Sequence, residues 1–279
     1  MSAYRFCRTD DIALLVDALN HCWAPYVPDA APMTPAAFKR SIRDLQLWCS
    51  SCMVAHSGAD PIGVLIGAKR PSATLVHRIA VHPDHRRQGH GRHLLSSLGS
   101  KLAILGPPRI VAEVPDTSEA ACALFVASGF DEEAVLTDYV MDGERRDSGS
   151  TGTGGFVIPV SLDDLAANGL LGGPAMCWER SVETLTARKA EVAGLAVASD
   201  ERIEACILYI ERGAGAEVLL LRSFVEDGGD RLQHLLRRLG EPVTFGKVHP
   251  GEISHTCLET LGFRAAGLHR LYSASAQPD

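Results

Sequence analysis

The residue types best suited to chemistry in this sequence lie in a basic, glycine-rich turn at residues 79–92, Ile-Ala-Val-His-Pro-Asp-His-Arg-Arg-Gln-Gly-His-Gly-Arg. A strand is expected to end at Val81, and Gly89 and Gly91 are expected to open the next helix. Glycines let consecutive backbone N–H groups face a large anion, and a helix N-terminus adds the favourable end of its dipole. The arginines at 86, 87 and 92 add positive charge. The turn therefore predicts a pyrophosphate site.

The turn matches neither of the two common phosphate-binding motifs. No Gly-Lys-Ser/Thr follows it, so it is not a Walker loop, and no third glycine completes the Gly-x-Gly-x-x-Gly dinucleotide pattern. The pattern alone leaves open an ordinary basic turn between a strand and a helix.

A second segment makes the interpretation more specific. Residues 79–91 closely resemble the acetyl-CoA signature of the GNAT N-acetyltransferase superfamily, a hydrophobic-Ala-Val-x-Pro strand end followed by Gln/Arg-x-x-Gly-x-Gly/Ala. Residues 118–130, Ser-Glu-Ala-Ala-Cys-Ala-Leu-Phe-Val-Ala-Ser-Gly-Phe, resemble that family's Asn-x-x-Ala-x-x-x-Tyr-x-x-x-Gly-Phe marker. The resemblance covers residues 3–141 well. Over 156–273 only the order of elements and a final Gly-Phe pair remain.

The resemblance implies an α+β fold with a mixed, mostly antiparallel sheet flanked by helices, in which acetyl-CoA lies where the fourth and fifth strands diverge. The backbone of residues 79–81 would hold the pantetheine and the acetyl carbonyl, with the Val81 amide as oxyanion donor. Residues 87–92 would surround the pyrophosphate. The expected cofactor-binding residues are Ile79, Ala80, Val81, Arg86, Arg87, Gln88, Gly89, His90, Gly91, Arg92, Ser118 and Phe125.

Two of these positions depart from the family pattern. Ser118 replaces the asparagine, and Phe125 replaces a tyrosine that commonly protonates the leaving thiolate. A thiol with a pKa near ~8.5 can leave without a dedicated acid, but more slowly. Glu113 and His77, on the two strands beside the opening, are the candidate general bases. A solvated strand carboxylate and a packed histidine are the alternatives, and no metal site is expected.

The favoured function is therefore that of an acyltransferase that moves an acetyl group from acetyl-CoA to a primary amine. Such an enzyme transfers a group other than an amino-acyl group. The acceptor, a small molecule or a peptide, is not identified. The alternative is a catalytically weak or inactive CoA-binding sensor or partner-binding module. The helix-and-loop region at 21–26 is expected to line the acceptor site, with ordinary packing of Trp23 and Tyr26 as the equal alternative.

The segment Trp48-Cys49-Ser-Ser-Cys52 resembles a thioredoxin-type redox motif. A redox dithiol should follow a strand and begin a helix, because the helix N-terminus lowers the pKa of the first thiol. Here the motif follows a helical stretch and precedes a strand, so structural cysteines are the preferred interpretation.

The elements that position these residues occur twice. Residues 144–155, rich in Gly, Ser and Thr, are expected to link a GNAT domain at 1–143 to a second, degenerate GNAT-like domain at 156–279. Both halves show strands, a helix with apolar residues at helical spacing, and a late Gly-Phe pair. Coincidence between two small α+β domains is the alternative.

The second half departs most where the first has its basic turn. Residues 224–231 are shorter and carry three acids, Glu226, Asp227 and Asp230, which would repel a polyanion. This half is expected to bind no CoA and to serve in packing, in shaping the acceptor site or in dimerisation.

Composition limits the wider function. The chain has 279 residues and a formal net charge of −7, from 27 basic and 34 acidic residues, which argues against a nucleic-acid partner. No apolar run is long enough to span a membrane, so no membrane partner is expected. The eight scattered cysteines suggest free thiols in a reducing compartment, and the predicted location is the cytoplasm. A homodimer remains open.

Overall fold

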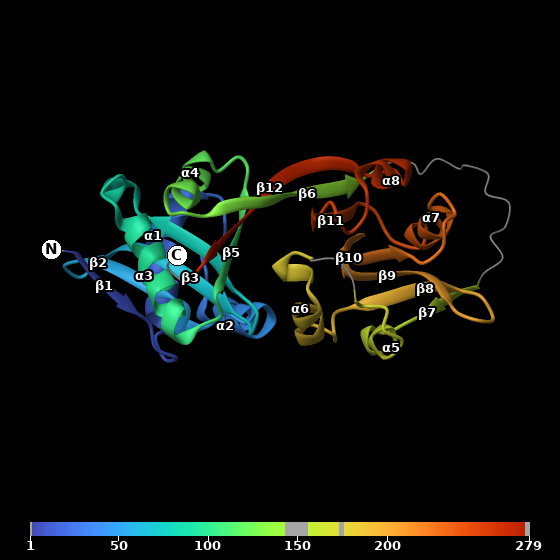
Figure 1. Cartoon of the computed structure of the whole chain (residues 1–279), viewed down its shortest axis with the longest axis horizontal. Helices are drawn as coiled ribbons and strands as arrows, with labels where there is room; N and C mark the ends of the chain where they lie inside the picture. Colours follow the sequence, from blue (N-terminus) through green and yellow to red (C-terminus); the bar gives the residue numbers. More distant parts are fainter. Residues whose placement is uncertain (1, 143–155, 173–175, 277–279) are drawn as a thin grey trace. The chain divides into compact units, whose positions relative to one another are not determined.

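The computed structural model of the protein describes residues 2–142, 156–172 and 176–276, and its chain forms two compact units (Figure 1). Unit 1 contains Met1–Glu133 together with Arg270–Asp279, and unit 2 contains Ala134–His269. The expected domains, 1–143 and 156–279, differ from this division. The reason is that the chain passes from one unit to the other within two long strands, β6 (Asp131–Met141) and β12 (Arg264–Ser275). The expected linker, 144–155, lies outside the described residues.

The sheet of unit 1 has five strands from the first half of the sequence. They are β1 (Ser2–Phe6), β2 (Met53–Ser57), β3 (Asp60–Lys69), β4 (Thr74–Val81) and β5 (Arg109–Pro115). They lie in this order, and β12 follows beside β5. All neighbours from β1 to β4 are antiparallel, whereas β4 and β5 are parallel. The C-terminal strand of the second half thus completes the sheet of the first unit.

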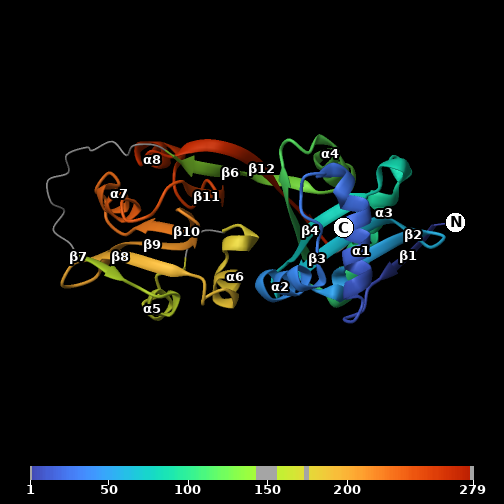
Figure 2. The same cartoon turned by 180° about the vertical axis from the view of Figure 1, so that it is seen from behind.

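Helices cover both faces of this sheet. They are α1 (Ile12–Trp23), α2 (Pro35–Leu45), α3 (His90–Leu105) and α4 (Glu119–Ala127), with short 3₁₀ helices at Ala24–Tyr26 (η1), Cys49–Ser51 (η2) and Pro83–His85 (η3). Figures 1 and 2 show α3 and α1 on opposite faces. The predicted apolar stripe of α3, at 94, 95, 98 and 102, is buried against the sheet in one core with Phe125 of α4.

Unit 2 repeats the arrangement. Its strands are β7 (Phe156–Pro159), β8 (Ala193–Ala198), β9 (Ile203–Arg212), β10 (Gly215–Ser223) and β11 (Val243–Val248), and β6 lies next to β11. Its helices are α5 (Leu162–Ala167), α6 (Val182–Ala187), α7 (Asp230–Leu236) and α8 (His255–Thr260), with the 3₁₀ helix η4 (Trp178–Arg180). As in unit 1, one neighbouring pair, β10 and β11, is parallel.

A shared irregularity supports the repeat. One extra residue bulges from β4 at His77, between the partners of Ile66 and Gly67, and one bulges from β10 at Leu219. The bulge interrupts the strand that precedes the glycine-containing turn in both units. The structure is therefore an α+β fold with two similar units in tandem, as the sequence predicts.

Two sequence interpretations concern other segments. Cys49 begins η2 and Cys52 is fully buried, and burial raises the pKa of the Cys52 thiol far above its usual range. Such a thiol is a poor nucleophile, which agrees with a structural role.

No helix among the described residues is long and apolar enough to cross a membrane.

Candidate active site

The basic turn folds as its sequence predicts, with β4 ending at Val81 and α3 beginning at His90. Gly89 is the N-cap of α3 and has a φ of +86°, a left-handed conformation that glycine adopts without strain. Arg87 also has a positive φ, +61°. The first N–H groups of any helix have no acceptor within it, so α3 directs its donors and the positive end of its dipole toward this turn.

Glycine is required at Gly89 and at Gly91 of the turn for different structural reasons. A Cβ atom at Gly89 would meet no heavy atom within 4 Å, so the positive φ alone explains this glycine. At Gly91 a Cβ atom would lie 3.0 Å from a methyl carbon of Leu124 on α4. Gly91 therefore allows α3 and α4 to pack closely, a role that the sequence did not reveal.

Positive charge is exposed around the turn. Arg86, Arg87 and Arg92 all lie at the surface, and none of them forms an ion pair with another described residue. The Arg86 guanidinium lies 5.7 Å from the ring centre of Tyr26. An anionic ligand at the turn would therefore face three exposed arginines.

His90 points inward from the start of α3. Its side chain is buried, and its Nδ1 atom lies 2.5 Å from the Tyr4 hydroxyl oxygen on β1. Its other nitrogen, Nε2, is buried without a hydrogen-bond partner. Burial, with the nearby His85 and His93, lowers the pKa of His90. The imidazole is therefore neutral near pH 7.

The fourth and fifth strands diverge at the expected place. β4 and β5 pair only at their beginnings, where Thr74 is the partner of Ile110 and Leu75 the partner of Val111. Beyond these pairs, β3 is the only strand that pairs with β4 among the described residues, including at 79–81. The backbone on the β5 side of these residues is therefore not paired with β5, as the pantetheine site requires.

The two candidate bases lie on the diverging strands. His77 is the bulged residue of β4, and Glu113 lies on β5 two residues beyond its last pair with β4. Both side chains are half-buried. The neighbours Ala112 and Val114 belong to the core shared with α3, so the alternation of a strand directs Glu113 to the opposite face.

The α4 positions of the second motif lie in different surroundings. Ser118 is the N-cap of α4 but its side chain makes no capping hydrogen bond, and it is half-buried. Phe125 is only 2% exposed and packs against the rings of Phe130 and Tyr272, with centroids 5.1 and 5.8 Å away. The phenylalanine is thus part of the core.

Residues 21–26, which form the end of α1 and η1, contact the end of β4. The Tyr26 hydroxyl donates a hydrogen bond to the Val81 carbonyl oxygen at 2.5 Å, and Trp23 lies under the Arg78 guanidinium at 5.5 Å. His21 stacks on His82 with a centroid distance of 4.8 Å. Each of these three side chains thus contacts a residue at or just after the end of β4, which fits the predicted acceptor side.

A cavity of about 470 Å³ lies beside α3, next to the end of α4. Its lining includes Arg92, His93 and Ser96 of α3 and Ser128 just after α4. The cavity adjoins the turn through Arg92, so a ligand whose phosphates contact the turn could extend into it.

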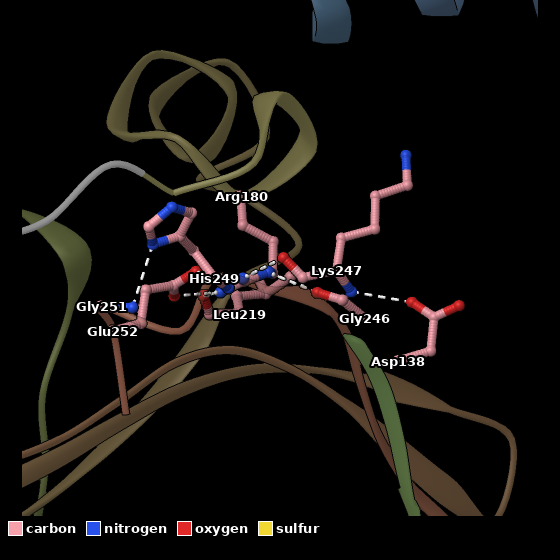
Figure 3. Close-up of polar contacts among 8 residues, drawn as sticks. All are labelled: Asp138, Arg180, Leu219, Gly246, Lys247, His249, Gly251 and Glu252. Atoms are coloured by element: carbon pink, nitrogen blue, oxygen red, sulfur yellow. Dashed lines mark hydrogen bonds and ion pairs between the residues drawn. The ribbon is translucent and has the colours of Figure 1, made fainter. Parts of the chain in front are cut away.

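The corresponding opening in unit 2 is filled by a side chain. β10 and β11 pair from Ala216 to Val218 and then diverge. Figure 3 shows the guanidinium of Arg180 in this place, where it donates to the carbonyl oxygens of Leu219, Gly246 and Lys247 at 2.7–3.2 Å. Glu252 accepts two further hydrogen bonds, at 2.7 and 2.8 Å. All five N–H groups of the buried guanidinium thus have acceptors.

The turn of unit 2 also contains its own anion. Gly229 keeps a left-handed φ of +95° as the N-cap of α7. The Asp227 carboxylate accepts hydrogen bonds from the N–H groups of Gly229 and Arg231, both at 3.0 Å. The Arg231 side chain pairs with Asp227 and Glu204. A carboxylate therefore occupies the helix N-terminus that in unit 1 faces the exposed arginines.

Comparison with known proteins agrees with this geometry. Residues 15–130 match the sequence model of the acetyltransferase (GNAT) family. Over 90 residues the chain is 39% identical to the [ribosomal protein bS18]-alanine N-acetyltransferase of Escherichia coli K12. That alignment covers 32% of this chain, and the chain spans only 57% of the length of the relative.

Two solved structures share the fold of the whole chain. A tandem GNAT protein from the clavulanic acid biosynthesis pathway has a TM-score of 0.65 and 17% identity, with 100% of both chains covered. A GCN5-related N-acetyltransferase from Sphaerobacter thermophilus has a TM-score of 0.66 and 13% identity, over 99% of this chain and 96% of the other. Residues 15–130 thus match the acetyltransferase (GNAT) family model, and the whole chain has the fold of these tandem GNAT structures, which confirms the predicted pair of GNAT-like domains.

Proposed function

We propose that unit 1 transfers an acetyl group from acetyl-CoA to a primary amine. The observation that carries this proposal is the opening between β4 and β5, which adjoins the N-terminus of α3 and three exposed arginines. The pantetheine would lie along residues 79–81, and the pyrophosphate would contact the turn at 87–92. The cavity beside Arg92 would accept the adenosine end. The expected location of the reaction is the cytoplasm.

The chemistry needs few groups. The amine nitrogen attacks the thioester carbonyl carbon, the C–S bond breaks, and the proton of the amine passes to Glu113 or His77, directly or through water. The Val81 amide would stabilise the oxyanion. Because Phe125 has no hydroxyl, the sulfur leaves as a thiolate or takes its proton from another group.

The acceptor class is supported by the curated relative. That protein is named for acetylation of an alanine on a ribosomal protein, so a peptide with a free N-terminal alanine is a suitable first acceptor. The test measures thiol release from acetyl-CoA with this peptide and a panel of small amines. Turnover that Arg87→Glu reduces supports the proposal. The absence of turnover with every amine, despite CoA binding, would favour a CoA-binding sensor.

We further propose that each chain holds one acetyl-CoA. In unit 2 the Asp227 carboxylate and the Arg180 guanidinium occupy the places of the pyrophosphate and the pantetheine. Titration calorimetry on the full chain should give one CoA per chain, and Gly89→Glu should abolish all binding. A second CoA site that survives Gly89→Glu would contradict this assignment.

A further inference from the structure

The C-terminal part of β12 packs against α4 of unit 1. Residues 270–276 follow the whole second half in sequence but belong to the first unit, beside β5. Tyr272 is 2% exposed, and its ring lies nearly parallel to that of Phe125, with an interplanar angle of 12°. The ring of Tyr272 therefore supports the inner face of α4.

Arg270 contacts the chain both before and after α4. Its Nε atom lies 2.5 Å from Oδ1 of Asp116, in the loop between β5 and α4. Its Nη1 atom lies 2.7 Å from Oε2 of Glu132, at the start of β6. One guanidinium thus holds the point where the chain leaves β5 and the point where it returns to the sheet.

The segment held in this way forms part of the candidate site. Ser118, which is expected to contact the pantetheine, lies two residues after Asp116 at the N-cap position of α4. Leu124 of α4 packs against Gly91 of the basic turn. A shift of α4 would therefore move a pantetheine contact and disturb the start of α3.

We propose that Arg270 and Tyr272 are positioning residues for the acetyl-CoA site of unit 1. They hold the loop at 116–118 and α4 in the geometry that binds the cofactor, without touching the reacting atoms. This inference rests on the proposed function for its kinetic consequences, but its effect on CoA affinity can be measured without turnover.

The test compares Arg270→Gln with Arg264→Gln. Arg264 lies on the same strand and also forms an ion pair, with Asp142, but it belongs to unit 2. Arg270→Gln removes two exposed ion pairs beside α4, so it should raise the KM for acetyl-CoA and the Kd for CoA about three- to tenfold. Arg264→Gln should leave both of these constants unchanged. Neither variant should change the KM for the amine.

Further variants separate positioning from general stability. Arg270→Lys, which can contact one carboxylate, should recover part of the CoA affinity. Asp116→Asn should weaken CoA binding in the wild-type chain but add little to Arg270→Gln, because both changes break the same pair. Tyr272→Phe should keep the ring contact and the affinity, whereas Tyr272→Ala should lose affinity.

Two results would overturn the inference. One is an equal CoA affinity in Arg270→Gln and Arg264→Gln. The other is a loss of CoA affinity in Arg270→Gln that is explained by a lower unfolding temperature. In that case an equally destabilising change in unit 2 would cause the same loss of affinity. If the wild-type chain binds CoA but acetylates no amine, the proposed function fails while the comparison of Kd values still decides on Arg270. If the wild-type chain binds no CoA, both proposals fail.

Discussion

Gly91 and Gly99 lie on the same helix, yet a methyl group should have opposite effects at the two positions. At Gly91 the new Cβ atom would press on Leu124, and such overpacking costs about 1–3 kcal/mol. At Gly99 the closest atom would be 4.0 Å away, so alanine should gain about 0.5–1 kcal/mol from helix propensity. Chemical denaturation of Gly91→Ala and Gly99→Ala measures both. Similar stabilities in the two variants would contradict the packing role of Gly91.

His90 should make the stability of the chain depend on pH. Burial lowers its pKa in the folded state, so below the ordinary histidine pKa the unfolded chain binds a proton that the folded chain does not. Its contribution is therefore fully present above about pH 6.5 and is lost as the pH falls toward the lower folded pKa.

The measurement is the free energy of unfolding at several pH values between 7.5 and 5.5. His90→Gln should show a smaller decrease over this range than the wild type, because glutamine binds no proton. An unchanged decrease in His90→Gln would show that other groups cause the acid sensitivity.

At the residue scale, the sequence predicts what depends on near neighbours. The left-handed Gly89 and the end of β4 at Val81 follow from a local pattern of glycines, proline and strand residues. The contact of Gly91 with Leu124 and the hydrogen bond of Tyr26 with Val81 do not, since each joins residues that only the folded chain brings together.

At the scale of elements, one buried ion pair holds η4 to the diverging ends of β10 and β11. Removing the Glu252 side chain would leave the Arg180 guanidinium buried with an unpaired charge, which costs about 3–5 kcal/mol. Glu217 is the matched control, because its pair with Arg212 is exposed and is worth about 1 kcal/mol or less.

The prediction is a large loss of stability for Glu252→Ala and a small one for Glu217→Ala, as measured by chemical denaturation. If the two variants lost the same free energy of unfolding, the buried pair of Arg180 and Glu252 would not be essential for the stability of unit 2.

The sequence predicts the presence and the order of most elements, because apolar spacing and capping residues are local. It also indicates the altered turn of unit 2 from its acids. It does not reveal Arg180, which lies 39 residues from Leu219 and 72 from Glu252 in sequence. Nothing near Arg180 distinguishes it from an ordinary surface arginine.

At the scale of the whole molecule, the boundaries of the units do not coincide with the halves of the sequence. Composition predicts a division at 144–155, whereas the compact units divide at 133/134 and 269/270. The strands β6 and β12 follow the two Gly-Phe pairs, and the exchange depends on their neighbours in the sheet, which no local sequence pattern reveals.

A fragment of residues 1–143 should therefore not fold cooperatively. It lacks Tyr272, which covers Phe125, and Arg270, which holds both ends of α4. Thermal unfolding followed by circular dichroism should show no sharp transition, and addition of a peptide of residues 264–279 should restore one. A fragment that melts cooperatively on its own would show that β12 is dispensable.

The exchanged strand also sets an order of events during synthesis. Unit 1 begins at the N-terminus, but its sheet is completed by residues 270–276, so the ribosome must first translate all of residues 134–269. At ~5–20 residues per second, the nascent first half waits for several seconds with the core beneath α4 uncovered. Unit 2 can then assemble no later than unit 1, although most of unit 1 is made first. The candidate site of unit 1 thus becomes complete only after residues 270–276 have been made.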